Sequence, residues 1–296
     1  MKSRRKRRKT LLTVINLSLL FSSLLALLAL FFLLRQPEQS KENQSESASS
    51  QQVTKQEEKA SSEQVNWTVQ DQPVKIPILM YHAIHEMAPE EAANANLIVS
   101  PTTFESQIKR LVDEGYYFLS PEEAYRALTE NSLPSSKVVW LTFDDSLLDF
   151  YTIAYPIMTK YKVKATNNVI TGYTESGKAG HLSIDQIKEM AKNGMSFQSH
   201  TVNHPDLEMS AQETQENELS QSKSYLDTVL KQETTAIAYP AGRYSQTTLS
   251  LAEHSYKLGV TTNEGIASAD DGLLSLKRIR ILPNTDPDTL IASMTS

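Results

Sequence analysis

The sequence predicts an α/β fold with a parallel sheet for residues 74–296, behind a membrane anchor and a polar linker. From Val74 onward, short apolar runs rich in β-branched residues alternate with amphipathic helical patterns, which is typical of a parallel sheet with crossover helices. An uncharged apolar run fills residues 11–34, and residues 35–73 have almost no apolar side chains. The length of the folded part suits one barrel-like domain, somewhat short of the roughly 250 residues of a full eightfold barrel.

Residues 1–34 predict a membrane anchor with a cytoplasmic N-terminus. As a helix, residues 11–34 would span about 36 Å, enough for a hydrocarbon core of roughly 30 Å. The basic tail 1–10 should stay in the cytoplasm by the positive-inside rule. A cleaved signal peptide is the alternative, but the apolar run exceeds the usual 7–15 residues and no small-residue cleavage site follows it. The chain has no cysteine, so lipid attachment to a cysteine is excluded.

Residues 35–73 predict a flexible extracytoplasmic linker, because a segment of Gln, Ser, Glu and Lys cannot bury enough surface to offset chain entropy. Residues 1–35 hold eight of the 29 Lys and Arg residues, so the rest of the chain carries a formal charge of −14. A body of that charge repels phosphate, which excludes a nucleic-acid partner. The absence of cysteine also excludes disulfides, thiolate metal sites and a cysteine nucleophile. We expect a monomer on the outer membrane face, within the wall of a Gram-positive bacterium.

The folded part contains seven strand candidates, each a short apolar run with β-branched residues. They are residues 76–82, 137–143, 164–170, 195–199, 235–239, 259–262 and 278–282. Helix start signals lie between them. Ser100 precedes Pro101, Ser120 and Glu123 form a capping box, and Ser183 pairs with Gln186. Gly194 should end the third helix, and further helices are expected over 210–232 and 245–258, the last ending at Gly259.

Two carboxylates, Asp144 and Asp145, directly follow the strand candidate 137–143. In parallel sheets the chemistry gathers at the carboxyl ends of the strands. Two acids there are costly unless something compensates them, most simply a metal. A plain Asp-Asp turn explains this motif alone equally well.

Two histidines, His200 and His204, follow the strand candidate 195–199. His-x-x-x-His lets two imidazoles converge on one ion, and an Asp from another strand would complete a two-His, one-carboxylate face. Two surface histidines by chance are the alternative. His82 ends the first strand of the domain; a packed histidine is the usual explanation there, but beside the other motifs it becomes a candidate general acid.

Together these motifs resemble the polysaccharide deacetylase family, also called carbohydrate esterase family 4 or the NodB-homology domain. The resemblance rests on LTFDD (141–145), SHTVNHPDL (199–207) and AYPAG (238–242). ILMYHAI (78–84) and LKRIRIL (276–282) are similar to the branch with a circularly permuted barrel, which acts on surface polysaccharides containing N-acetylglucosamine. The resemblance covers residues 76–283 and implies a distorted (β/α) barrel.

The resemblance also implies roles for individual residues. Asp145, His200 and His204 match the metal ligands, usually for Zn²⁺, with Co²⁺ and Ni²⁺ left open. Asp144 matches the catalytic base and His82 the acid. Ala241 matches the donor of a backbone N–H to the oxyanion, in a loop whose Tyr239 is expected to contact substrate. Arg278 matches the arginine that orients the base.

Two departures from the family pattern concern the site. Ser146 replaces the usual Gly after the Asp pair, which would narrow the approach over the metal. Asn167 and Asn168 stand on a strand that is normally apolar. Because their side chains point to opposite faces, one should reach the site and contact sugar, or both belong to a structural hydrogen-bond network. His85, His181 and His254 are interpreted as surface or helix-flanking residues.

The sequence therefore predicts a membrane-anchored, metal-dependent de-N-acetylase of N-acetylglucosamine in a cell-wall or surface glycan. An O-deacetylase needs the same site and is the first alternative. A metal-free glycosidase that uses Asp144 with a second carboxylate is another. A wall-binding protein of the same fold without activity is the alternative from a different class.

Overall fold

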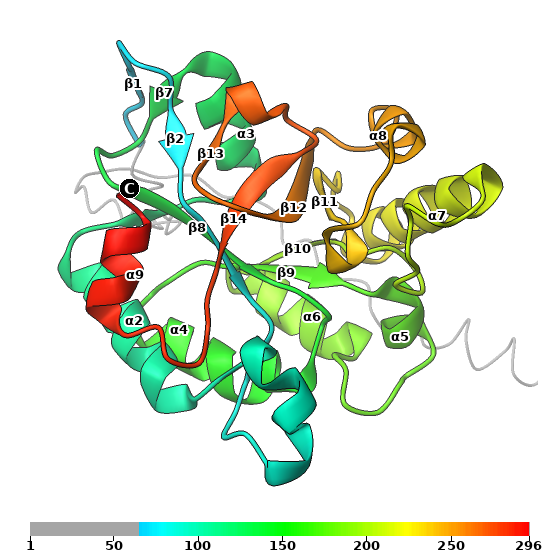
Figure 1. Ribbon diagram of the computed structural model, residues 1–296, viewed down its shortest axis with the longest axis horizontal. Helices are drawn as coiled ribbons and strands as arrows, with labels where there is room; N and C mark the ends of the chain where they lie inside the picture. Colours follow the sequence, from blue (N-terminus) through cyan, green and yellow to red (C-terminus); the bar gives the residue numbers. More distant parts are fainter. Residues whose placement is uncertain (1–64, 296) are drawn as a thin grey trace, which may run out of the picture. The chain divides into compact units, whose positions relative to one another are not determined.

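A closed barrel of seven parallel strands forms the centre of the domain within residues 65–295, the part that this computed structural model describes (Figure 1). The strand order is β3-β14-β12-β11-β10-β9-β8, and the pairing of β3 with β8 closes the ring. The bounds are Ile78–Tyr81 for β3, Val138–Phe143 for β8, Thr166–Val169 for β9, Ser196–Ser199 for β10, Ala236–Ala238 for β11, Leu258–Glu264 for β12 and Leu276–Arg280 for β14. Seven strands had been predicted, at positions that agree within a few residues.

Side chains of each strand alternate between the inside of the barrel and the layer between strands and helices. Ile78 and Trp140 belong to one buried cluster with Leu258 and Leu276. Their neighbours Leu79 and Leu141 pack in a second cluster with helix residues. This period of two is what strands covered on both faces require. It also decides which polar residues of each strand can reach the inside of the barrel.

Helices cover the outer face of the barrel, and α2, α4 and α6 lie along one side of it in Figure 1, with α9 beside α2. Their bounds are Pro101–Asp113 for α2, Pro121–Glu130 for α3, Tyr155–Lys160 for α4, Thr171–Glu175 for α5, Ile184–Lys192 for α6, Gln212–Leu230 for α7, Gln246–Ala252 for α8 and Pro287–Ser293 for α9. The predicted caps are present: the side chains of Ser100, Ser120 and Ser183 each accept a backbone N–H of the first turn. Gly194, with φ of 92°, follows the C-cap of α6 as predicted.

Short elements connect the barrel strands. They are β2 (Lys75–Ile76), β4 (Ala83–Ile84), β5 (Ile98–Val99), β6 (Tyr117–Phe118), β7 (Ser132–Leu133), β13 (Ala267–Ser268) and the helical turns η1 (Pro89–Leu97), η2 (Phe150–Ala154), η3 (Pro240–Gly242) and η4 (Ala269–Asp271). β6 pairs with the first half of β8 outside the ring. These elements, α4, α5 and α9 were not predicted.

The predicted end of a helix at Gly259 is wrong. α8 ends at Ala252, and Gly259 lies inside β12. A Cβ there would lie 2.5 Å from the Leu274 carbonyl oxygen and 2.6 Å from the Tyr239 hydroxyl. The glycine therefore marks a close approach of chain segments and not a helix C-cap.

The folded domain begins before Val74. β1 (Thr68–Val69) pairs with β7, and the Arg126 guanidinium lies 4.3 Å from the centre of the Trp67 ring. The boundary predicted at residue 73 is therefore too late in the chain, because Trp67 and β1 already pack on the domain.

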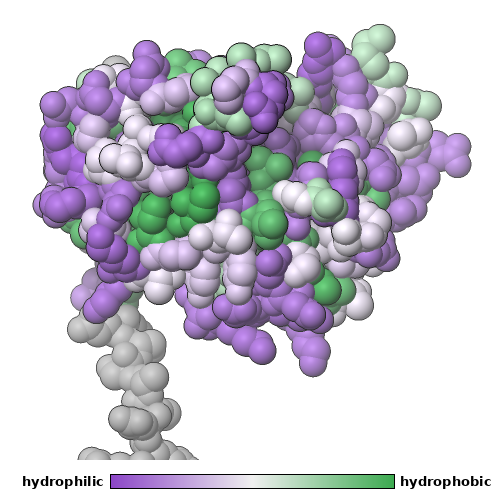
Figure 2. All heavy atoms as spheres, turned by 90° about the horizontal axis from the view of Figure 1, so that it is seen from below, coloured by the Kyte–Doolittle hydropathy of each residue, from purple (hydrophilic) through white to green (hydrophobic). Residues whose placement is uncertain are grey.

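The predicted basic tail, the anchor at 11–34 and the linker up to residue 64 lie outside the described residues. Among residues 65–295, no helix is both long and apolar enough to cross a membrane. Hydrophilic residues dominate the face shown in Figure 2, with several areas of hydrophobic residues between them.

Candidate active site

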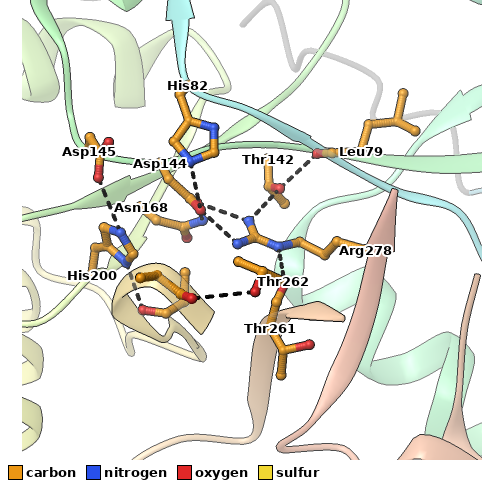
Figure 3. A network of polar contacts seen from close by, with 12 residues as sticks. Leu79, His82, Thr142, Asp144, Asp145, Asn168, His200, Thr261, Thr262 and Arg278 are labelled. Atoms are coloured by element: carbon orange, nitrogen blue, oxygen red, sulfur yellow. Dashed lines mark hydrogen bonds and ion pairs between the residues drawn. The ribbon is translucent and has the colours of Figure 1, made fainter. Parts of the chain in front are cut away.

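Polar side chains from five barrel strands converge at the carboxyl end of the barrel (Figure 3). Asp144 and Asp145 follow β8, His200 follows β10 and His82 follows β3. Asn168 lies on β9 and Arg278 on β14. Parallel strands bring their ends to one rim, which explains why motifs far apart in the sequence meet here.

The three predicted metal ligands form one compact group. The ligand atoms of Asp145, His200 and His204 all lie within 4.8 Å of one another. Asp145 Oδ1 is 3.3 Å from His200 Nε2 and 3.5 Å from His204 Nε2. Ligand atoms around a four-coordinate Zn²⁺, with bonds of about 2.0–2.1 Å, lie roughly 3.3 Å apart. Two imidazoles and one carboxylate thus suit a divalent transition metal in both chemistry and spacing.

Hydrogen bonding fixes the tautomer of His200. Its Nδ1 lies 2.7 Å from the Ala238 carbonyl oxygen and must donate to it, so Nε2 keeps the free lone pair that a metal needs. Burial would lower the pKa of His200, but the Asp145 carboxylate raises it above the usual value. Burial and the neighbouring His200 lower the pKa of His204. Burial opposes the ionised form of Asp145, and the bond to His200 nevertheless holds its pKa below the usual range.

Asp144 lies inside the barrel, held by three hydrogen bonds from two side chains. Arg278 donates from Nη1 to Oδ1 at 2.9 Å and from Nη2 to Oδ2 at 2.6 Å. Asn168 Nδ2 donates to Oδ1 at 2.7 Å. Burial alone would raise the pKa of Asp144, but the Arg278 charge and bidentate bond hold it far below its usual range. Asp144 is therefore ionised at neutral pH.

Arg278 is itself fully buried. Its Nε donates to the Thr261 carbonyl oxygen at 2.7 Å, and Nη1 also donates to Thr142 Oγ1 at 3.1 Å. Thr142 in turn donates to the Leu79 carbonyl oxygen at 2.7 Å. These contacts fix the plane of the guanidinium, so Asp144 has one orientation. Thr142 could not be identified from the sequence as part of this network, because threonine is common on buried strands.

His82 lies close to the Asp144 carboxylate. Its Nε2 is 4.0 Å from Asp144 Oδ2. Burial lowers the pKa of His82 and outweighs the opposing effect of the two aspartates. The imidazole is thus neutral at pH 7 in the metal-free protein.

The loop after β11 contains Ala241 in a left-handed conformation, with φ of 51°. Among residues 65–295, no group accepts a hydrogen bond from the Ala241 N–H. The side chain of Tyr239, in contrast, is fully buried and donates to the Leu274 carbonyl oxygen at 2.9 Å. The prediction that this side chain contacts substrate is wrong, because strand alternation turns it away from the inside of the barrel.

The two asparagines of β9 divide as the alternation predicts, and both are buried. Asn168 is 1% exposed and contacts Asp144. Asn167 is fully buried, and within the described part of the chain its amide has no hydrogen-bond partner. The prediction that one of the two reaches the site is confirmed for Asn168, which joins the hydrogen-bond network around Asp144; contact with sugar stays a prediction.

Ser146 does not narrow the site. Its side chain is fully buried, and its hydroxyl accepts the Ile170 N–H at 3.3 Å. The serine instead ties the Asp loop to the end of β9. Within residues 65–295, five of the eight non-glycine residues with positive φ lie in the site loops: Asp145, Ser146, Thr201, His204 and Ala241. Backbone strain of this kind collects where function requires a particular geometry.

A pocket of about 570 Å³ opens beside the metal ligands, and both His82 and Asp145 line it. His85, which was interpreted from the sequence as a surface or helix-flanking residue, lies in its wall. His85 Nδ1 is 2.7 Å from Asp149 Oδ2, and Nε2 is 3.1 Å from the Glu91 carboxylate. These hydrogen bonds join η1 to the segment that follows Asp145 in the sequence. No local signal could have revealed it, since the partner Asp149 is 64 residues away.

Comparison with known proteins agrees with this arrangement. A family model for polysaccharide deacetylase matches residues 131–261. A putative polysaccharide deacetylase of Bacillus subtilis, YxkH, is 42% identical over 218 residues, which cover 73% of this chain and 75% of the relative. The chain belongs to the polysaccharide deacetylase family.

Two further matches are proteins named as deacetylases. The structure of the Streptococcus pyogenes deacetylase PplD in complex with acetate is 65% identical, with a TM-score of 0.74, and the match covers 76% of this chain and 100% of that one. The poly-β-1,6-N-acetyl-D-glucosamine N-deacetylase of Staphylococcus aureus is 31% identical over 199 residues, 63% of this chain and 68% of the relative. The barrel of this chain is thus the NodB-type fold that the family resemblance implied.

Proposed function

We propose that this deacetylase is a metal-dependent hydrolase that removes acetyl groups from N-acetylglucosamine residues of a bacterial cell-wall or surface polysaccharide. The observation that carries the proposal is the adjacency of two sites. Asp145, His200 and His204 form a metal-ligand group, and the next residue, Asp144, is an ionised carboxylate with a fixed orientation. One binds an electrophilic ion and the other accepts a proton.

The chemistry needs both. A divalent ion at Asp145, His200 and His204 would polarise the acetamide carbonyl and make water more acidic. Asp144 accepts the proton of the water that attacks the carbonyl carbon. The unpartnered N–H of Ala241 donates to the oxygen that becomes negative. Zn²⁺ suits the donor set, and Co²⁺ and Ni²⁺ suit it as well.

His82 protonates the departing amine nitrogen as the C–N bond breaks. Because burial lowers its pKa, we propose that it starts neutral and gains the proton that Asp144 removed from water. The 4.0 Å between the two side chains permits this relay after a small rotation. Acetate and a glucosamine residue with a free amine are the products.

The relatives support a glycan rather than a small-molecule substrate, since the S. aureus relative is named for a polymer of N-acetylglucosamine. The pocket beside the metal ligands offers about 570 Å³, enough for a sugar unit next to the reacting one. It combines apolar wall residues such as Leu148 and Ile98 with the polar His85 and Asn94, a mixture that suits the apolar ring faces and the hydroxyls of a sugar.

The proposed location is the outer face of the cytoplasmic membrane. The apolar residues 11–34 and the basic tail 1–10 support a single-pass anchor with a cytoplasmic N-terminus. Protease treatment of intact cells should then digest the catalytic domain and leave the N-terminal tail.

Chelation tests the function. The full chain, incubated with Gram-positive walls, should release acetate and an equal amount of new glucosamine amines. A chelator should abolish both, and Zn²⁺ should restore them. Acetate without new amines would indicate an O-deacetylase, and acetate release that survives complete metal removal would contradict the proposal. No acetate from metal-loaded protein on any N-acetylated glycan would favour a wall-binding protein.

A further inference from the structure

The loop that carries His204 has an unusual backbone. Thr201 has φ of 65° and His204 has φ of 57°, so two non-glycine residues within four positions are left-handed. Both conformations cost free energy relative to ordinary backbone, because the Cβ of a left-handed residue crowds the following carbonyl oxygen. Such a loop keeps its shape only when surrounding contacts determine it.

A buried carboxylate holds the N–H groups of this loop. Glu218 lies on α7 and is 7% exposed. Its Oε2 accepts the backbone N–H groups of Val202 and Asn203, each at 2.8 Å, and its Oε1 accepts Asn203 Nδ2 at 2.7 Å. Successive N–H groups that converge on one anion form a concave anion-binding turn. Here the anion belongs to the protein itself.

The carbonyl groups of the same loop are held from the opposite side by α5. The Thr171 N–H donates to the Thr201 oxygen at 3.1 Å, and the Gly172 N–H donates to the Val202 oxygen at 2.9 Å. A Cβ at Gly172 would lie 2.7 Å from the Val202 oxygen, so only glycine fits this approach. α5 and α7 therefore clamp the loop between them.

We propose that Glu218 is a positioning residue of the metal centre: by fixing residues 201–204, it sets where His204 meets the ion. The inference rests on the metal dependence proposed above. His200 has separate support, since it directly follows β10 and bonds to the Ala238 carbonyl oxygen. Within residues 65–295, the His204 ring has no hydrogen bond to the carbonyl of a neighbouring strand, and the His204 N–H donates to Thr201 Oγ1 inside the loop. Loss of Glu218 should thus loosen one ligand of three.

Metal affinity and geometry test the proposal directly. The apparent Kd of the full chain for Zn²⁺ is measured by competition with a chromophoric chelator, and Co²⁺ absorption reports the coordination geometry. Glu218→Ala should weaken Zn²⁺ binding about 10–100-fold, the usual effect of removing a group that orients a ligand, and should change the Co²⁺ spectrum. Glu216→Ala is the matched control, since Glu216 is an exposed residue of the same helix. This variant should bind both metals as the unaltered chain does.

Two conservative variants separate the effect of side-chain length from the effect of charge. Glu218→Gln keeps an oxygen at the right distance for the two backbone N–H groups and should recover most of the affinity. Glu218→Asp keeps the charge but is one methylene shorter, so it should bind Zn²⁺ more weakly than Glu218→Gln. This pair carries the test if Glu218→Ala does not fold.

Wild-type Zn²⁺ affinity and an unchanged Co²⁺ spectrum in Glu218→Ala, or in Glu218→Asp, would overturn the role of Glu218. If the unaltered chain itself bound neither metal, the proposed function would fail instead, so the two failures are distinguishable.

Discussion

Arg278 keeps the buried Asp144 carboxylate ionised and holds it in one orientation. A carboxylate that is 3% exposed is costly to keep ionised, and the bidentate Arg278 contact offsets that cost. The same contact makes Asp144 a weak base, because its pKa lies far below the usual range. The reaction therefore needs a water molecule that is already acidified, which is what a metal at the neighbouring Asp145 would supply.

Removal of Arg278 should destabilise the protein. In Arg278→Ala, Asp144 stays buried without its charge partner, and we expect the free energy of unfolding to fall by about 3–5 kcal/mol. Urea denaturation measures this. Arg243→Ala is the control, since Arg243 pairs with Asp206 on the surface and should change stability little. A loss no larger than that of the control would show that the buried pair is not needed to hold the barrel together.

At the scale of single residues, the sequence predicted which side chains gather but not every orientation. Asp144, Asp145, His200 and His82 were identified because they end strands, and strand ends meet. Asn167 and Asn168 were ambiguous because adjacent strand residues face opposite ways, and the phase depends on how the barrel closes. Tyr239 was misplaced for the same reason.

At the scale of elements, Glu91–His85–Asp149 connects η1 to the segment that follows the Asp pair. The Asp149 carboxylate also accepts the Ile84 N–H at 2.9 Å, and Glu91 accepts the Ala88 N–H at 2.8 Å. These hydrogen bonds hold the first turn of η1, through Glu91, against the segment that lines the pocket. Partial burial lowers the pKa of His85, but the two carboxylates raise it more, so it is above its usual value.

The sign of this pKa shift gives a pH prediction. A histidine whose pKa is raised in the folded state stabilises that state fully below its unfolded pKa of about 6.5. The contribution disappears as the pH rises through the folded pKa. Amide exchange of η1 should thus be slower at pH 6 than at pH 8, after correction for intrinsic rates, and His85→Gln should remove the difference. NMR titration gives the pKa of His85 directly. A value at or below 6.5 would contradict the stabilising role of the Glu91–His85–Asp149 contacts.

The elements with local signals were predicted, and those without were not. Ser100, Ser120 and Ser183 define helix starts through contacts three residues away, so the sequence contains the whole interaction. Gly259 was misinterpreted because its partner Leu274 is brought near only by the fold. β6 is two residues long and depends on β8 for its hydrogen bonds.

At the scale of the whole molecule, the closure of the barrel determines the site. The pairing of β3 with β8 puts His82 beside Asp144, although 62 positions separate them in the chain. The α/β class and seven strands followed from alternation and length. The length of the folded part suggested a barrel-like domain, and the family resemblance implied a barrel. Periodicity does not say which strands are neighbours, so it could not predict the pairing that closes the ring.

The Asp144→Asn variant, compared with the unaltered chain after both are loaded with Zn²⁺, is the most direct test of the central claim. Acetate and new glucosamine amines are quantified together with bound metal. We predict equal metal content and acetate release at least about 100-fold slower in the variant, the loss expected for a general base. Acetate release at the unaltered rate, with the metal still bound, would contradict the assignment of Asp144 and with it the proposed division of work between the two aspartates.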